Sequence, residues 1–336
     1  MLIPNDTGHP YRMNKFIEYQ HKVPPIGPAT YIEYAKRNNL YEDDCIMLAW
    51  YNSMTYCEVT ALYLFNMLDY KKIQRRTIKE FWENEKPNLV FNSARRYVKS
   101  MDWFESLMDT FMRQIKREPL IWLRRVSAST GDWKDRPQER YKKLYKDMMK
   151  WKYMGRFSVE LFMDALVQFS REGLISTTYQ AEHFEWNKGS NITSGMLNMF
   201  YMDDAAELFD KEGILSESTE DRLNELIKEV QRGIKIKYPE QDTSIGVITP
   251  KMCSWRNLFK GRRYGGYHHD RQLEQLIEYT ENYPEYKELW DEIYQIRKDV
   301  FEPYLLGELE GWKGIRKERS KLWLREGVTG VEKEIS

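Results

Sequence analysis

Cysteine is scarce in this sequence, with three residues among 336, so a fold held together by disulfide bonds is excluded. Cys45, Cys57 and Cys253 are odd in number, widely spaced and in no C-x-x-C pair. This spacing indicates free thiols in a reducing compartment. A chain of this length buries enough surface in its core to fold without such cross-links.

Long hydrophobic runs are lacking as well. The longest apolar stretch, around Cys45 to Leu68, is interrupted by the polar residues Asn52, Ser53, Thr55, Glu58, Thr60 and Asn66. It predicts a buried helix and not a membrane span. The N-terminal residues MLIPNDTGHPYRMNKF show no charged-then-apolar signal pattern. We therefore expect a cytoplasmic protein without membrane contact.

Neither sign of charge is in excess, because 52 Lys and Arg residues balance 52 Asp and Glu residues. This balance argues against a nonspecific DNA coat, which is usually basic, but leaves room for a local basic cleft. Basic residues lie beside aromatic ones at Arg95, Arg96 and Lys99, and again at Arg124 and Arg125. These clusters suit DNA backbone phosphates, and ordinary surface charge is the alternative.

Patterns of strand alternation are scarce, and helical spacing dominates. Apolar residues recur at intervals of three and four at Phe104, Leu107, Met108, Phe111, Met112 and Ile115. The best strand candidate, Val247–Thr249, is short. One long helix is expected from Glu42 to about Leu68, and Ser218 with Asp221 has the spacing of a capping box. We predict an all-α, multi-helix globular fold.

The chain is predicted to form a single α-helical catalytic domain over residues 1–336. Two lobes, about 1–237 and 251–336, are the alternative, with the loop 238–250 between them. That segment, YPEQDTSIGVITP, is equally compatible with a linker and with a long surface loop.

The segment 253–271, CSWRNLFKGRRYGGYHHDR, concentrates cations around a glycine-rich turn before a helix begins. Backbone amides at a helix start, together with arginine side chains, suit phosphate or pyrophosphate. The segment lacks the G-x-x-x-x-G-K-S/T pattern of a Walker loop. His268 and His269 point apart on a helix, so no metal site is expected, and either is a candidate proton carrier. A solvated basic loop with Asp270 as a helix cap is the alternative.

The segment WYNSMTYCEVT places Tyr51, Met54, Thr55 and Glu58 on one face of the expected helix. Glu58 is a carboxylate within apolar sequence, and burial raises the pKa of such a group. It then becomes a candidate for taking a proton from an amine or hydroxyl. A structural Glu58 paired with a core arginine is the alternative.

The segment 151–166, WKYMGRFSVELFMDAL, predicts two helices joined by a turn at Gly155, with Ser158 as N-cap of a helix over Val159–Arg171. It is similar to a helix-hairpin-helix, in which the turn amides and Arg156 hold a DNA phosphate, although the usual second glycine is replaced by Met154 or shifted. A plain αα-corner is the alternative.

The segment 188–197, KGSNITSGML, gathers small hydroxyl and amide side chains ahead of an apolar helix. These are Ser190, Asn191, Thr193 and Ser194. Such groups suit recognition of a base edge or capping of the helix.

Three of these segments, YNSMTYCEVTALYLF, KGSNITSGML and CSWRNLFKGRRYGGYHHDR, together with the arginine-rich middle, resemble the phage amino acid:DNA transferases. That family is also called α-glutamyl/putrescinyl thymine pyrophosphorylase. The similarity spans roughly Asp44 to Leu276. It implies a fold related to helical DNA glycosylases, which the hairpin around Gly155 fits.

The resemblance implies thymidine hypermodification in bacteriophage DNA. A kinase first pyrophosphorylates hydroxymethyluracil, and the transferase then displaces pyrophosphate with the amine of a free amino acid. The implied partners are double-stranded DNA carrying the modified uracil and that amino acid. A monomer in the cytoplasm of the infected bacterial host is expected, with no cofactor. The identity of the amino acid is left open.

The resemblance also suggests roles, since a base inside a duplex must be flipped out to react. Catalytic candidates, which take the amine proton or stabilise the leaving pyrophosphate, are Glu58, His269, Asp270 and Arg271. Substrate-binding candidates are Tyr51, Thr55, Arg156, Asn191, Thr193, Ser194, Lys260, Arg262, Arg263 and Tyr267. DNA-binding candidates are Arg95, Arg96, Lys99, Arg124, Arg125 and Gly155.

Two other functions compete with transfer. A DNA-glycosylase-like hydrolase acting on a modified base needs an aspartate to activate water, and Asp203 or Asp204 is available. A non-catalytic helical DNA-binding protein needs neither residue.

Overall fold

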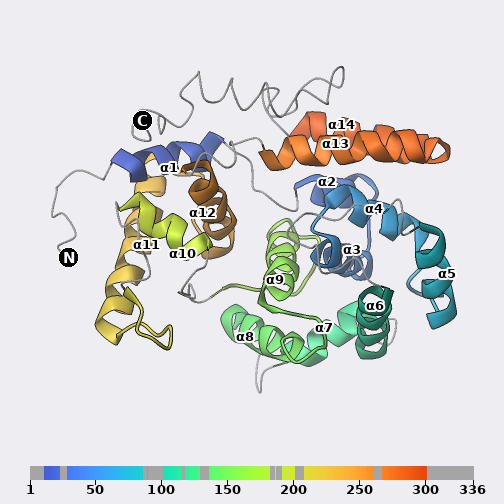
Figure 1. The fold of residues 1–336 in the computed structure, drawn as a ribbon, viewed down its shortest axis with the longest axis horizontal. Coiled ribbons are helices and arrows are strands. Elements are labelled where there is room, and N and C mark those ends of the chain that lie inside the picture. Colours follow the sequence, from blue (N-terminus) through green and yellow to red (C-terminus); the bar gives the residue numbers. More distant parts are fainter. Residues whose placement is uncertain are drawn as a thin grey trace. The chain divides into compact units, whose positions relative to one another are not determined.

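The computed structural model describes residues 11–22, 29–85, 89, 101–115, 118–128, 136–181, 186, 191–200, 208–259 and 267–300 (Figure 1). All regular elements in these ranges are helices, and one isolated bridge pairs Phe209 with Leu215. The predicted all-α fold is confirmed. The best strand candidate, Val247–Thr249, is not a strand, because these residues lie in a helix. No helix in these ranges is long and apolar enough to cross a membrane.

The chain forms two compact units. Unit 1 contains residues 1–26, 182–271 and 303–336, and unit 2 contains residues 27–181 and 272–302. The segment 238–250 lies inside unit 1, where its second half begins helix α12. A single catalytic domain stays a prediction.

Unit 2 is built around a buried helix. Its helices are α2 (Ala29–Arg37), α3 (Glu42–Thr55), α4 (Glu58–Met67), α5 (Arg75–Glu85), α6 (Met101–Ile115), α7 (Pro119–Ser127), α8 (Pro137–Met148), α9 (Arg156–Arg171), the part of α13 (Tyr267–Asn282) after residue 271, and α14 (Lys287–Val300). Every residue of α3 from Cys45 to Thr55 is buried, as expected of a helix covered on all sides. The Trp50 ring of α3 stacks on Phe111 with centroids 4.0 Å apart.

The long helix predicted from Glu42 to Leu68 is broken in two. Tyr56 ends α3 in a left-handed conformation, with φ of 49°. The Thr55 hydroxyl bonds the carbonyl of Tyr51 at 3.0 Å and accepts the Cys57 N–H at 3.3 Å, so the backbone has local partners that replace helical ones. The Cys57 side chain then caps α4. Because of this break, Glu58 does not continue the face of Tyr51 and Thr55.

Two predicted helix starts also differ from the observed ones. Gly155 precedes α9, and Ser158 already lies inside that helix, where its N–H bonds the Gly155 carbonyl at 2.9 Å. Ser216, not Ser218, caps α11 by accepting the Thr219 N–H. In both cases the helix begins two or three residues earlier than the hydroxyl pattern predicted.

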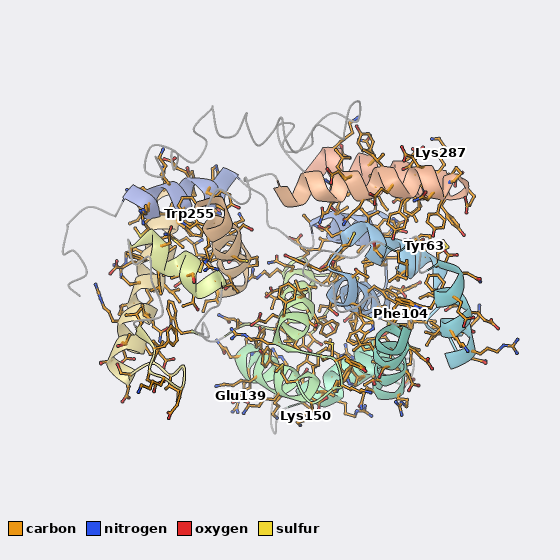
Figure 2. All side chains as sticks on the ribbon, in the orientation of Figure 1. Tyr63, Phe104, Glu139, Lys150, Trp255 and Lys287 are labelled. Carbon is orange, nitrogen blue, oxygen red and sulfur yellow. The ribbon has the colours of Figure 1, made fainter. Side chains whose placement is uncertain are left out.

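Unit 1 contains α1 (Tyr11–Lys22), α10 (Asn191–Met199), α11 (Glu217–Lys237) and α12 (Ile245–Phe259). Helices α10 and α12 pack against each other (Figure 1). A Cβ atom at Gly195 would lie 2.0 Å from the Met252 carbonyl oxygen, so only glycine permits this crossing. Trp255, labelled in Figure 2, joins α12 to α1 through an edge contact with Phe16 at 5.7 Å.

We expect Gly195→Ala to destabilise the protein by about 2–3 kcal/mol, because the added methyl collides with rigid backbone, and this outweighs the better helix propensity of alanine. Gly155→Ala is the matched control, since nothing lies within 4 Å of a Cβ atom there. Urea unfolding of both variants measures the difference. Equal midpoints for the two variants would contradict the close crossing.

Candidate functional site

Glu58 is the first residue of α4 and is 2 % exposed. Its Oε2 atom accepts the main-chain N–H of Thr30 at 2.8 Å, near the start of α2. Its Oε1 atom accepts a hydrogen bond from Gln272 Nε2, also at 2.8 Å, on α13. The carboxylate therefore satisfies a helix-start N–H that has no partner within α2, and links three helices of unit 2.

The hydrogen-bond chain continues to a buried arginine. Gln272 Oε1 accepts from Arg297 Nη1 at 2.7 Å, and Arg297 of α14 is fully buried. Burial raises the pKa of Glu58, and the hydrogen bonds from Thr30 and Gln272, with the Arg297 charge, partly offset the rise. This environment resembles the structural alternative, a core glutamate connected to an arginine, although the connection runs through Gln272.

The three residues predicted to share a face with Glu58, which are Tyr51, Met54 and Thr55, are fully buried in unit 2. The Tyr51 hydroxyl donates to the Leu68 carbonyl at 3.4 Å. The Thr55 hydroxyl donates to main-chain carbonyls of Tyr51 and Cys57. Both side chains bond the protein's own backbone, so their proposed contact with substrate stays a prediction.

Helix α8, a turn over residues 149–155 and helix α9 follow in order, so residues 151–154 lie in the turn and not in the first helix, and a DNA-binding helix-hairpin-helix stays a prediction. Trp151 and Met154 are buried and anchor the turn. Gly155, with φ of −81° and ψ of 166°, faces open space. Arg156 Nε donates to Glu160 Oε1 at 2.6 Å. Tyr153, in the middle of the turn, has a left-handed φ of 67° and is 43 % exposed.

This hairpin contacts the turn that precedes Glu58. The rings of Tyr56 and Phe157 meet edge to face with centroids 5.2 Å apart. Residues about a hundred positions apart in the sequence are thereby neighbours on unit 2. Two of the predicted functional segments, the one with Glu58 and the one with Arg156, therefore come together.

The hydroxyl-rich segment 188–197 belongs to unit 1. Asn191 begins α10, so Thr193 and Ser194 lie in a helix. Thr193 is fully buried, and Ser194 is partly buried. The sequence placed Asn191, Thr193 and Ser194 ahead of a helix, whereas the structure places them inside it.

Part of the basic segment lies outside the described residues, including Lys260, Arg262 and Arg263. Helix α13 begins at Tyr267, so His269, Asp270 and Arg271 lie in its first two turns. The positions of these four side chains are outside the described part of the structure. Their roles stay predictions.

The basic pair of α7 is exposed. Arg124 Nη2 donates to Ser176 Oγ at 2.8 Å, and Arg125 Nη2 donates to the Gln114 carbonyl at 3.1 Å. The other predicted DNA contacts, Arg95, Arg96 and Lys99, and the aspartates of the hydrolase alternative, Asp203 and Asp204, lie outside the described residues. Within those residues, no three His, Cys, Asp or Glu side chains gather as metal ligands.

Lys251 of unit 1 is a buried charge-bearing group that sequence reasoning missed. It is 2 % exposed, and its Nζ donates to the main-chain carbonyl of Gln20. Gln241 Nε2 donates to the same carbonyl at 2.8 Å, while the Gln20 side-chain amide is buried without a hydrogen-bond partner. Burial lowers the pKa of Lys251 to about 7. The one sequence signal is a lone lysine in the apolar stretch ITPKMCSW.

We expect Glu58→Ala to lower the free energy of unfolding by about 2–4 kcal/mol, because it leaves the Thr30 N–H and the Gln272 amide without acceptors. Glu58→Gln should cost less, since one oxygen remains as an acceptor. Glu172, an exposed carboxylate paired with Lys36, supplies the control variant Glu172→Ala, with a loss below about 1 kcal/mol. Chemical unfolding checks this, and similar losses in both Ala variants would contradict it.

The buried Lys251 predicts a stability that depends on pH. Its folded-state pKa of about 7 lies below the ordinary value of 10.5, so between these pH values the unfolded chain binds more protons. Stability then rises with pH, by about 2 kcal/mol between roughly pH 7.5 and pH 9.5. Lys251→Met should remove this rise, whereas Lys211→Met, an exposed site in unit 1, should keep it. Identical pH slopes in wild type and Lys251→Met would rule out a neutral buried lysine.

The model of the amino acid:DNA transferase family matches residues 45–264, which is more than half of the chain. No curated protein and no solved structure matches this chain. The matched range contains Glu58, the hairpin around Gly155, the α10 segment and the basic residues Lys260 to Arg263. The chain belongs to the amino acid:DNA transferase family.

Proposed function

We propose that this protein transfers a free amino acid onto 5-pyrophosphoryloxymethyl-uracil in double-stranded phage DNA. Membership in the amino acid:DNA transferase family carries the proposal. A carbon–nitrogen bond forms between the amine and the base methylene, the carbon–oxygen bond to pyrophosphate breaks, and one proton leaves the amine. The setting is the cytoplasm of the infected bacterium, and the protein acts as a monomer.

The hairpin of unit 2 is the proposed DNA-binding element. The conformation of Gly155 is open to any residue, and no neighbouring atom fills the space of its missing side chain. Neither the backbone nor internal packing therefore requires glycine at this position. A glycine that precedes a helix lets an outside group approach the first amides, and a DNA phosphate suits those donors.

The chemistry divides between leaving group and nucleophile. The uracil ring assists departure of pyrophosphate through a ring-stabilised methylene intermediate, and Lys260, Arg262, Arg263 and Arg271 are proposed to neutralise the leaving charge. Asp270, His269 or Glu58 is proposed to take the amine proton. Glu58 has both oxygens engaged by Thr30 and Gln272, which favours the other two residues.

The decisive experiment mixes the full chain with pyrophosphorylated DNA and a pool of amino acids. Nucleosides are then analysed by mass spectrometry and released pyrophosphate is measured. We expect one modified nucleoside, in which an amino acid has replaced the pyrophosphate group, for each pyrophosphate released. Hydroxymethyluracil DNA without pyrophosphate is the control and should stay unchanged. Abasic sites would instead indicate a glycosylase-like hydrolase, and no product from any amino acid would overturn transfer.

A further inference from the structure

The turn between α8 and α9 carries a concentration of exposed apolar side chains. Seven large apolar side chains are strongly exposed among the described residues. Three of them, Met149, Tyr153 and Phe157, lie within this turn and the start of α9, at 40 %, 43 % and 41 % exposure. Scattered exposed apolar residues need no explanation, but a local group of them marks a contact surface. We call Met149–Phe157 the aromatic turn.

Tyr153 has a backbone conformation that its residue type disfavours. The N–H of Met154 bonds the carbonyl of Trp151 at 3.1 Å and closes a tight turn with Tyr153 as its third residue. A positive φ at that place is ordinary for glycine or asparagine, and Tyr153 has φ of 67°. A left-handed tyrosine is strained, and here the strain is not offset by burying the ring. Such strain in an exposed residue points to a role outside the fold.

The charge around Tyr153 selects the class of partner. Lys150 and Lys152 are exposed on either side of the buried Trp151, and Figure 2 labels Lys150 at the end of α8. Lys152 Nζ lies 4.8 Å from the centre of the Tyr153 ring. Lys150 Nζ is 3.7 Å from the Asp147 carboxylate, a loose contact that an incoming anion can replace. An exposed ring beside two lysines fits a nucleobase with its adjacent phosphates better than it fits an apolar peptide or lipid.

We propose that Tyr153 stacks on a DNA base that has lost a stacking neighbour, while Lys150 and Lys152 contact the flanking phosphates. The adjacent ring pair Tyr56–Phe157 supports the turn from the side of the Glu58 segment. Stacking at this position stabilises an opened duplex next to the DNA-binding hairpin, which is the state that a reaction on an extruded base needs. This stacking proposal rests on the proposed function in one respect, which is that DNA is the partner.

The test uses unmodified DNA, so it needs no transfer chemistry. Fluorescence anisotropy of labelled oligonucleotides gives dissociation constants for a fully paired duplex and for the same duplex with one unpaired base. Wild type is expected to prefer the second. Tyr153→Gly removes the ring and relaxes the backbone, so lost binding cannot be assigned to unfolding. It should weaken binding to the unpaired-base duplex about 10-fold and leave the paired duplex within about 2-fold.

Three further variants separate stacking from charge. Tyr153→Phe keeps the ring and should bind like wild type. Tyr41→Ala removes another tyrosine of unit 2, 78 % exposed and distant in sequence, and should change neither affinity. Lys150→Ala with Lys152→Ala should weaken both duplexes equally and reduce the slope of log affinity against log salt by about two.

Two results would overturn the proposal. One is that Tyr153→Gly binds both duplexes as wild type does, which is also the outcome if the turn contacts protein or lipid. The other is an equal loss for both duplexes. If the protein transfers no amino acid, these binding results still test the stacking proposal. If Tyr153→Gly transfers an amino acid efficiently and binds both duplexes as wild type does, the stacking proposal is refuted and the proposed function is not.

Discussion

The packing of unit 2 depends on the carboxylate of Glu58. It accepts hydrogen bonds from Thr30 and from Gln272, and Gln272 in turn bonds Arg297. These three partners lie outside the range 45–264 that the family model matches. The flanking segments thus complete the hydrogen bonding of a buried group that the matched segment supplies. Removing α13 would take the Gln272 donor from this buried carboxylate, and removing α14 would take away the Arg297 charge, so each loss leaves the burial of Glu58 less well offset.

Glu58 and Lys251 show two outcomes of burying an ionisable group. Glu58 has two hydrogen-bond donors and a nearby arginine charge, which favour its ionised form against burial. Lys251 bonds a carbonyl, and burial alone accounts for its lowered pKa. A neutral lysine is nucleophilic and basic. The Glu58 carboxylate is instead held by two hydrogen bonds, from Thr30 and Gln272. These two buried groups, one from each unit, differ in how much of the burial penalty is offset.

Helical periodicity was sufficient to predict the fold class, because apolar stripes such as Phe104 to Ile115 follow from local spacing. The break at Tyr56 was not predictable, since it depends on hydrogen bonds that the Thr55 side chain makes across the turn. Val247–Thr249 was the best strand candidate, yet these residues lie in α12, which packs on α10. Glu58 was recognised as buried from its apolar neighbours, but its partners come from distant segments. The burial of Lys251 likewise depends on how the helices of unit 1 pack, which local sequence does not show.

The hairpin illustrates why residue type and backbone conformation must be considered together. Its sequence offers a glycine at position 155 and a tyrosine at position 153, and the left-handed φ falls on the tyrosine. Exchanging the two would relax the turn, so folding alone does not account for this order. A glycine next to the helix start exposes amides to a phosphate, and a tyrosine at the tip exposes a ring to a base. Gly155 and Tyr153 are therefore both explained if the turn contacts a phosphate and a base of the same DNA molecule.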